Sequence, residues 1–343
     1  MIRTARSTRM VPARLALLLT LACSLAGYRG TLLAQDIVEV RSEKTGNILK
    51  RKGEIKSWEG ASLTFDANGR TDSIPNETIV RIQTTWSADC LTGRQLLESR
   101  QFAAAIEPLA KAAAAETRPW AAAMIRAELV RSLSALGNDF DAVQQFVLIL
   151  SQDPETRWME FAPLAWDGGL VDTPMAAIAQ KCLEAKQPNL QLLGASWLLG
   201  TPQRGAAVEA LKKLKQDIRP EVAHLAAAQL WRAELPQASE KEVEGWVRQV
   251  ERMPESLRAG PLLLVGLASQ RLKLTDRAML SWMEIAILHG DNYRLAALGL
   301  SRSAALLAEQ GKAEAARRIW IELTQRFAGT QWATEAEARL GKE

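Results

Sequence analysis

The stretch GNDFDAVQQFVLILSQDP, residues 137–154, decides the fold of this chain. A Gly-Asn pair at its start is typical of a turn, and the residues after it are mostly good helix formers. A small residue, Ala142, is followed four positions later by Phe146 and twelve positions later by Pro154. Residues four apart share one face of a helix, and a small residue there lets a second helix approach closely. The stretch therefore predicts the second helix of a packed helical hairpin.

The tryptophans predict that this hairpin is repeated. Five intervals between tryptophans measure 34 to 38 residues, the length of one helical hairpin. Such self-similarity is typical of a repeat array, in which each hairpin buries its apolar face against its neighbours. We expect each indole to fill a notch left by alanine or glycine. The intervals join Trp86, Trp120 and Trp158, then Trp197 and Trp231, and then Trp246, Trp282 and Trp320.

The same arrangement of small, turn and bulky residues occurs in three more places: Gly93, Ala105 and Leu109; Gly266, Ala278 and Trp282; and Ala304, Gly311, Ala316 and Trp320. With the first stretch, these positions resemble the tetratricopeptide repeat over roughly residues 86–155 and 258–343. The closing proline of that repeat is absent from three of the four units. The resemblance implies a mainly α fold, a right-handed α-solenoid of helical hairpins. Such arrays bind proteins or peptides.

Residues 171–255 are predicted to be helical but fit this frame poorly, so we interpret them as divergent helical repeats. Helix starts are indicated at Thr173-Pro174, Thr201-Pro202 and Pro220-Glu221, and Ser239 with Glu242 forms a capping box. The loop at Trp166–Gly169 suggests a boundary near residue 170. The tetratricopeptide-like repeats then fall into an N-terminal part, residues 86–170, and a C-terminal part, residues 256–343.

Residues 36–85 predict a different structure. Apolar and β-branched residues alternate with polar ones, and glycine and asparagine interrupt the pattern every 8–12 residues. This is typical of about five short antiparallel strands, which we expect to close into a small β barrel. The spacing of Gly53, Ile55, Trp58, Gly60 and Leu63 resembles SH3-like or Sm-like barrels. Sm-like barrels are associated with RNA, but this segment has eight basic and eight acidic residues.

The N-terminus predicts export. Arg3, Arg6, Arg9 and Arg14 precede the apolar run LALLLTLACSLA, residues 15–26, which is typical of a Sec signal peptide. We place the signal peptide at residues 1–34, with cleavage after Ala34 preferred to cleavage after Ala26. The protein is then periplasmic or secreted. Residues 20–23 loosely resemble a lipobox, a motif whose cysteine carries a lipid. We therefore expect contact with a membrane only if Cys23 is lipidated.

Charge argues against a nucleic-acid partner. Residues 1–34 hold five arginines and no acid, so the remainder has 38 basic and 39 acidic residues, a net charge of −1. Nucleic-acid binding needs a basic surface. Cys90 and Cys182 remain after cleavage, either as two buried thiols or as a disulfide.

The sequence predicts neither an enzyme nor a cofactor or metal site. It contains no phosphate-binding loop, nucleophile elbow or zinc motif. Its two histidines, His224 and His289, lie 65 residues apart. We expect His224 in a helix and His289 at a helix end.

The predicted function is that of an exported, non-enzymatic scaffold or adaptor that binds a partner protein or peptide in a helical groove. In tetratricopeptide-like arrays the first helix of each hairpin faces this groove. The alternative is that the β module binds a glycan or another envelope polymer, with the helices as a spacer or dimerisation arm. A homo-oligomer is compatible with both. The frame gives these groove candidates: Arg94, Glu98, Glu128, Arg131, Gln270, Arg271 and Arg302.

Overall fold

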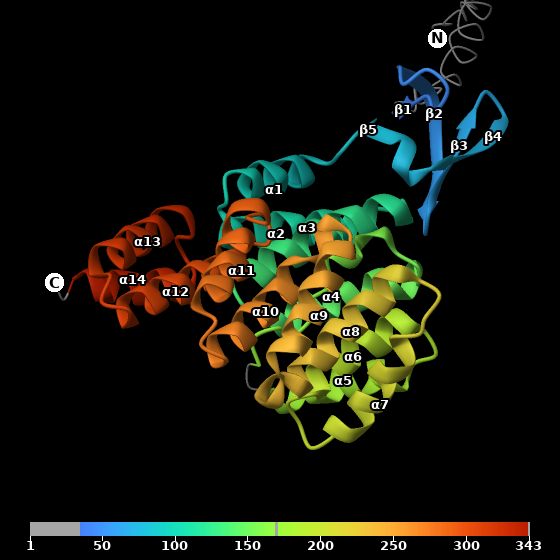
Figure 1. Cartoon of the computed structure of the whole chain (residues 1–343). Helices are drawn as coiled ribbons and strands as arrows, with labels where there is room; N and C mark the ends of the chain where they lie inside the picture. The colour runs from blue at the N-terminus through green and yellow to red at the C-terminus, as the bar shows by residue number, and fades with distance from the viewer. Residues whose placement is uncertain (1–34, 169–170, 342–343) are drawn as a thin grey trace, which may run out of the picture.

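The computed structural model describes residues 35–168 and 171–341. Within them, a small antiparallel sheet is followed by fourteen α-helices, as the β module and helical array predicted (Figure 1). The predicted signal peptide and Cys23 lie outside the described residues. None of the described helices combines the length and the apolar character that a membrane span requires.

The sheet contains five strands in the order β4-β3-β2-β1-β5, and all neighbours are antiparallel. A 3-10 helix, η1 (Asn76–Thr78), precedes the last strand. The strands are β1 (Asp36–Arg41), β2 (Ile48–Glu59), β3 (Ser62–Ala67), β4 (Arg70–Pro75) and β5 (Ile79–Gln83).

The predicted barrel is wrong, because β4 and β5 form opposite edges of an open sheet. The reason lies in helix α3 (Pro119–Ala135), whose first turn completes the core of the module. A sheet that is covered by a helix does not need to close on itself to bury its apolar face. The shared core consists of Val38, Ile55, Trp58, Leu63, Phe65 and Ile74 from the sheet, with Trp120 and Ala121 from α3.

Most consecutive helices pack against each other, except at the junctions of α4 with α5 and of α8 with α9 (Figure 1). The N-terminal hairpins are α1 (Ala88–Glu98) with α2 (Phe102–Ala115), and α3 with α4 (Asp139–Gln152). The middle helices are α5 (Thr173–Glu184), α6 (Pro188–Leu198), α7 (Arg204–Leu214), α8 (Pro220–Glu234) and α9 (Glu240–Arg252). The C-terminal helices are α10 (Ala259–Arg271), α11 (Thr275–Leu288), α12 (Tyr293–Glu309), α13 (Ala313–Arg326) and α14 (Gln331–Leu340). Short 3-10 helices are η2 (Arg157–Phe161), η3 (Leu235–Gln237) and η4 (Glu255–Leu257).

The four hairpins found from the sequence frame turn in the same way. Each turn contains one residue with positive φ, and the next residue donates its amide to a carbonyl five positions earlier. This is the hydrogen bond of a Schellman motif, which satisfies carbonyls at the helix end. The positive-φ residues are Arg100, Gly137, Lys273 and Gly311, and the amide–carbonyl pairs are Gln101–Leu96, Asn138–Leu133, Leu274–Ser269 and Lys312–Leu307. Residues 88–152 and 259–326 therefore contain repeated helical hairpins.

Two of the predicted notches are present. A Cβ atom on Gly266 would lie 2.1 Å from Nε1 of Trp282, and one on Gly93 would lie 2.6 Å from Cγ of Leu109. Real Cβ atoms do not approach neighbours so closely, so only glycine lets these helix pairs pack as they do. Trp282 is fully buried. For these positions the expected role of the bulky residue is confirmed.

Three other tryptophans do not occupy separate notches. Trp86, Trp120 and Trp158 gather around Trp58 of β2, where the sheet meets the helices. The ring centroid of Trp58 lies 6.5 Å from that of Trp120 and 6.3 Å from that of Trp158. The ring centroids of Trp86 and Trp120 lie 6.0 Å apart. The repeat-length intervals between these tryptophans thus reflect a shared docking cluster, which fixes the β module to the array.

The expected helix starts are mostly present. Ser239 and Glu242 form the capping box of α9, and Pro220 begins α8. The cap of α5 is Asp172, one residue before the expected Thr173, and α7 begins at Arg204, after the turn at Thr201. Cys90 and Cys182 are both buried and free. Burial raises the pKa of each thiol to about 11.

The array folds back on itself, so that its first and last hairpins touch. The rings of Phe102 on α2 and Tyr293 on α12 have centroids 4.5 Å apart. The guanidinium of Arg100 donates to the carbonyl of Arg326, 226 residues along the chain, at 3.4 Å. Helix α12 also contacts α3, and Figure 1 shows the middle helices below α2 and α3. This closure brings distant loops together and creates the site described next.

Two glycine substitutions test the notch. Gly266→Ala should destabilise the protein by about 1–3 kcal/mol, because the new methyl group must displace the buried ring of Trp282. Gly245→Ala, in the middle of α9, is the matched control. Its Cβ would meet only a guanidinium nitrogen of Arg248, 4.0 Å away, so alanine should stabilise by about 0.5–1 kcal/mol. Urea unfolding measures both, and a neutral Gly266→Ala would contradict the packing.

Candidate functional site

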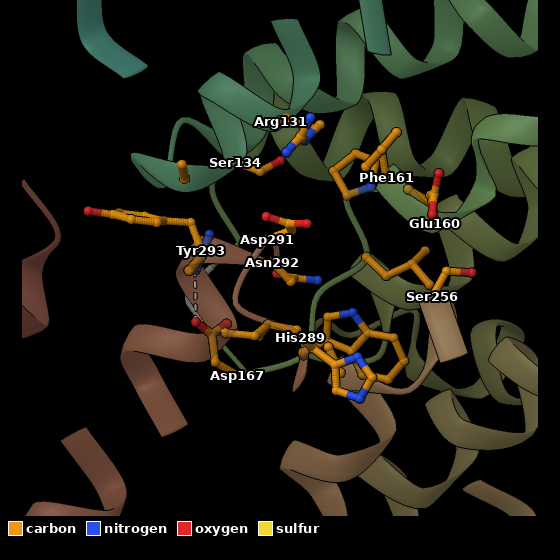
Figure 2. A pocket seen from close by; sticks show the side chains of 18 of the residues that line it. Arg131, Ser134, Glu160, Phe161, Asp167, Ser256, His289, Asp291, Asn292 and Tyr293 are labelled. Atoms are coloured by element: carbon orange, nitrogen blue, oxygen red, sulfur yellow. Dashed lines mark hydrogen bonds and ion pairs between the residues drawn. The ribbon is translucent and has the colours of Figure 1, made fainter. Parts of the chain in front are cut away.

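A cavity of about 460 Å³ lies where the array folds back. Its walls come from the end of α3, the start of α4, the loop from η2 to Asp167, η4 with the start of α10, and the turn between α11 and α12 (Figure 2). Most of these segments are helix ends and loops. We call this space the main cavity.

Four aromatic side chains, Phe161, Trp166, Trp197 and Tyr293, line the main cavity. The indole nitrogen of Trp197 donates to the carbonyl of Pro163 at 2.8 Å, which fixes the loop against α6. The ring of Trp166 lies so close to α10 that a Cβ on Gly260 would come within 2.1 Å of it. These contacts hold the aromatic walls in place.

Arg294, in the first turn of α12, joins three parts of the wall. It binds Asp139 at the start of α4 and, at 2.8 Å, Asp167 in the loop. The three side chains are only 21–25% exposed. Burial raises the pKa of Asp139, and the charge of Arg294 opposes that rise. Burial lowers the pKa of Arg294, but the two carboxylates outweigh it and the net shift is upward.

Three further carboxylates, Glu160, Glu255 and Asp291, line the main cavity. Among the described residues none of them forms an ion pair. Withdrawal from water raises the pKa of Glu160, the nearby charges of Arg157 and Arg131 lower it, and that of Asp291 raises it. Arg131, whose guanidinium lies 5.2 Å from the ring centroid of Phe161, is the other cation of the wall.

Two polar atoms of the lining are buried and have no hydrogen-bond partner among the described residues, Oγ of Ser134 and Nε2 of His289. His289 is the C-cap of α11, as the sequence predicted. Burial lowers its pKa, so the imidazole is neutral at pH 7. Buried polar groups normally have partners, so both atoms are available to a ligand.

A second cavity of about 330 Å³ adjoins the first, and the two share Arg131, Asp291 and Tyr293. Arg94, Glu98 and Arg100 line it from α1 and the turn after α1. The two cavities thus have part of their lining in common. We call them the groove.

Three of the seven groove candidates from the sequence line this groove, namely Arg94, Glu98 and Arg131. Glu128 lies behind it and accepts hydrogen bonds from Nε of Arg94 at 2.9 and 3.0 Å. Burial raises the pKa of Glu128, and Arg94 opposes that rise. Arg94 also covers the ring of Trp86, with its guanidinium carbon 3.9 Å from the centroid. Arg94 therefore has a structural role, because it binds Glu128 and covers the ring of Trp86.

The other three candidates, Gln270, Arg271 and Arg302, line neither cavity. Arg271 donates to the carbonyl of Ala238, and Arg302 is exposed on α12. A loop was predicted at Trp166–Gly169 and a helix end at His289, but not a loop over residues 160–165. Nothing local in the sequence indicates that these segments meet.

The described residues contain no group of three His, Cys, Asp or Glu side chains that could hold a metal ion. In the same part of the chain, no histidine is hydrogen-bonded to a serine or cysteine. The groove offers aromatic faces, carboxylates and two unpartnered polar atoms to a ligand. The prediction that the protein is not an enzyme stays a prediction.

Arg294→Met tests the contact that closes the array. At pH 7 it should destabilise the protein by about 2 kcal/mol, since Asp139 and Asp167 lose their partner while partly buried. Without Arg294 the pKa of Asp139 in the folded state lies further above its unfolded value. The folded state of the variant then binds the proton more tightly than the unfolded state does. The contribution of Asp139 to stability is therefore greatest at low pH and falls as pH rises through that pKa.

Urea unfolding at pH 4 and pH 7 measures this effect, and Arg302→Met on the exposed face of the same helix is the control. The loss caused by Arg294→Met should be smaller at pH 4 than at pH 7, and Arg302→Met should change stability by less than about 0.5 kcal/mol. An equal loss at both pH values would show that Asp139 is not the group left unpaired.

Comparison of the chain with protein-family models, with curated proteins and with solved structures finds no match. The function must therefore be argued from the groove itself.

Proposed function

We propose that this protein is an exported, non-enzymatic scaffold that binds an extended segment of a partner protein in the groove. In this proposal the helices form a right-handed, tetratricopeptide-like solenoid. The four hairpins with the same turn support that assignment, as do the glycines at Gly93 and Gly266, which the repeat frame requires to be small. Export rests on the basic and apolar leader sequence.

The observation that carries the proposal is the continuity of the two cavities. They share three residues and extend from α1 to η4, so one extended segment can contact both. Each volume falls at the lower end of the range, roughly 300–1,000 Å³, that is usual for ligand pockets. Each can thus hold a few side chains of a partner. Three contacts hold the walls in place: the ion pairs of Arg294, the hydrogen bond of Trp197 and the packing of Trp166 on Gly260.

A specific observation keeps the alternative function in view. The β module exposes aliphatic side chains at Ile48 and Leu49 on β2 and Val80 on β5, which are 44–55% exposed. Apolar atoms on a sheet surface can contact the faces of sugar rings or another protein. However, Trp120 of α3 is part of the module's core, so the module should be tested within the full chain.

The test is site-specific photocross-linking in cells, with p-benzoylphenylalanine replacing one exposed residue at a time. Ser256 reports on the main cavity, Leu49 on the β module, and Glu335 on the remote helix α14. We expect one protein partner to be cross-linked through position 256 and to be absent at position 335. Cross-links at position 49 alone would favour the β module, and equal yields at all three positions would contradict a defined groove.

A further inference from the structure

We propose that the main cavity receives a cationic side chain, arginine or lysine, of the partner segment, with an apolar residue beside it. This inference rests on the proposed function and names the chemistry of the ligand. It follows from the charges that remain unpaired, from the aromatic walls, and from the two polar atoms without partners.

The first argument is the charge of the lining. Five carboxylates and two guanidinium groups line the main cavity. Arg294 is already bound by Asp139 and Asp167. Arg131 then remains in the lining with Glu160, Glu255 and Asp291, and Arg157 lies near Glu160 outside the lining. Three carboxylates and two guanidinium groups leave an excess of negative charge. An anionic ligand would meet like charges in a confined space, whereas a cation would be attracted.

The aromatic side chains provide the second argument. A guanidinium or ammonium group is attracted to the face of an aromatic ring within about 6 Å of its centroid. Phe161, Trp166, Trp197 and Tyr293 all line the cavity. Leu288, at the end of α11, also lines it and is 61% exposed. The aliphatic part of lysine or arginine, and an apolar neighbour, can pack on such surfaces while the charged end reaches the carboxylates.

The third argument concerns Ser134 and His289. Oγ of Ser134 is an acceptor, and Nε2 of a neutral imidazole is one when the proton is on Nδ1. Both atoms are buried without a partner among the described residues. A guanidinium has five N–H donors in a planar array, which suits several acceptors at once. Figure 2 shows Ser134 and His289 on opposite sides of the cavity, with Asp291 between them.

The experiment selects ligands for the full chain from a phage library of random dodecapeptides. Each selection is repeated on Ser256→Trp, which places an indole at the exposed mouth of the cavity. Peptides that depend on the open cavity should be enriched in arginine or lysine next to an apolar residue. Thermal unfolding of every variant confirms that it remains folded.

The selected peptides are then synthesised and titrated against Glu160→Gln/Asp291→Asn, which keeps side-chain shape but removes two charges. Binding should weaken about tenfold or more, as is usual when close charge pairs at an interface are lost. The control Glu335→Gln/Glu337→Gln removes the same charge from exposed positions on α14 and should bind like the wild type.

The outcomes separate the two proposals. Cavity-dependent peptides without basic residues, or peptides that bind the Glu160→Gln/Asp291→Asn variant as well as the wild type, would overturn the cationic ligand and leave the peptide groove standing. If no peptide distinguishes the wild type from Ser256→Trp, the groove itself fails as a peptide site, and the cationic ligand fails with it.

Discussion

The contact of Arg294 with Asp139 and Asp167 is the constraint on which the rest of this structure depends. It connects the start of α12 to the start of α4 and to the loop before α5, which are 155 and 127 residues away in sequence. An array of hairpins normally contacts only its neighbours. Here a guanidinium between two carboxylates, together with the contact of Phe102 with Tyr293, joins the start of α12 to the first two hairpins. The main cavity exists because of that closure.

The closing contact and the candidate site use the same kind of chemistry for different purposes. Burying a guanidinium with two carboxylates is tolerable because the charges are paired and hydrogen-bonded. Glu160, Glu255 and Asp291 line the same cavity but form no ion pair among the described residues. Withdrawal from water raises the pKa of Glu160 although Arg157 and Arg131 lie near it, so the charged form of this carboxylate is in an unfavourable environment. Local departures from the most stable arrangement are typical of functional sites.

The local part of the fold was predictable from the sequence, and its closure was not. Small and bulky residues four apart, and turn residues such as Gly137 and Gly311, act within one hairpin and were read correctly. The open sheet was not foreseen, because Trp120 belongs to a helix and lies 37 residues beyond Gln83, the end of the module's last strand. Arg94, Glu98 and Arg131 were found because the frame places them on first helices. Gln270, Arg271 and Arg302 lie away from the two cavities, since that frame assumes an array that does not fold back.

The fold-back also couples ligand binding to the shape of the array. The walls of the main cavity come from α3 and α4, from the loop after η2, and from the turn between α11 and α12. A ligand that touches all of them binds the closed array only. By mass action it then stabilises closure by an amount that grows with its concentration relative to its dissociation constant. Because Arg294 and its two carboxylates set the closed state in the free protein, the ligand has less ordering to perform. Such pre-organisation would strengthen the binding of a ligand side chain, because less conformational freedom is lost when it binds.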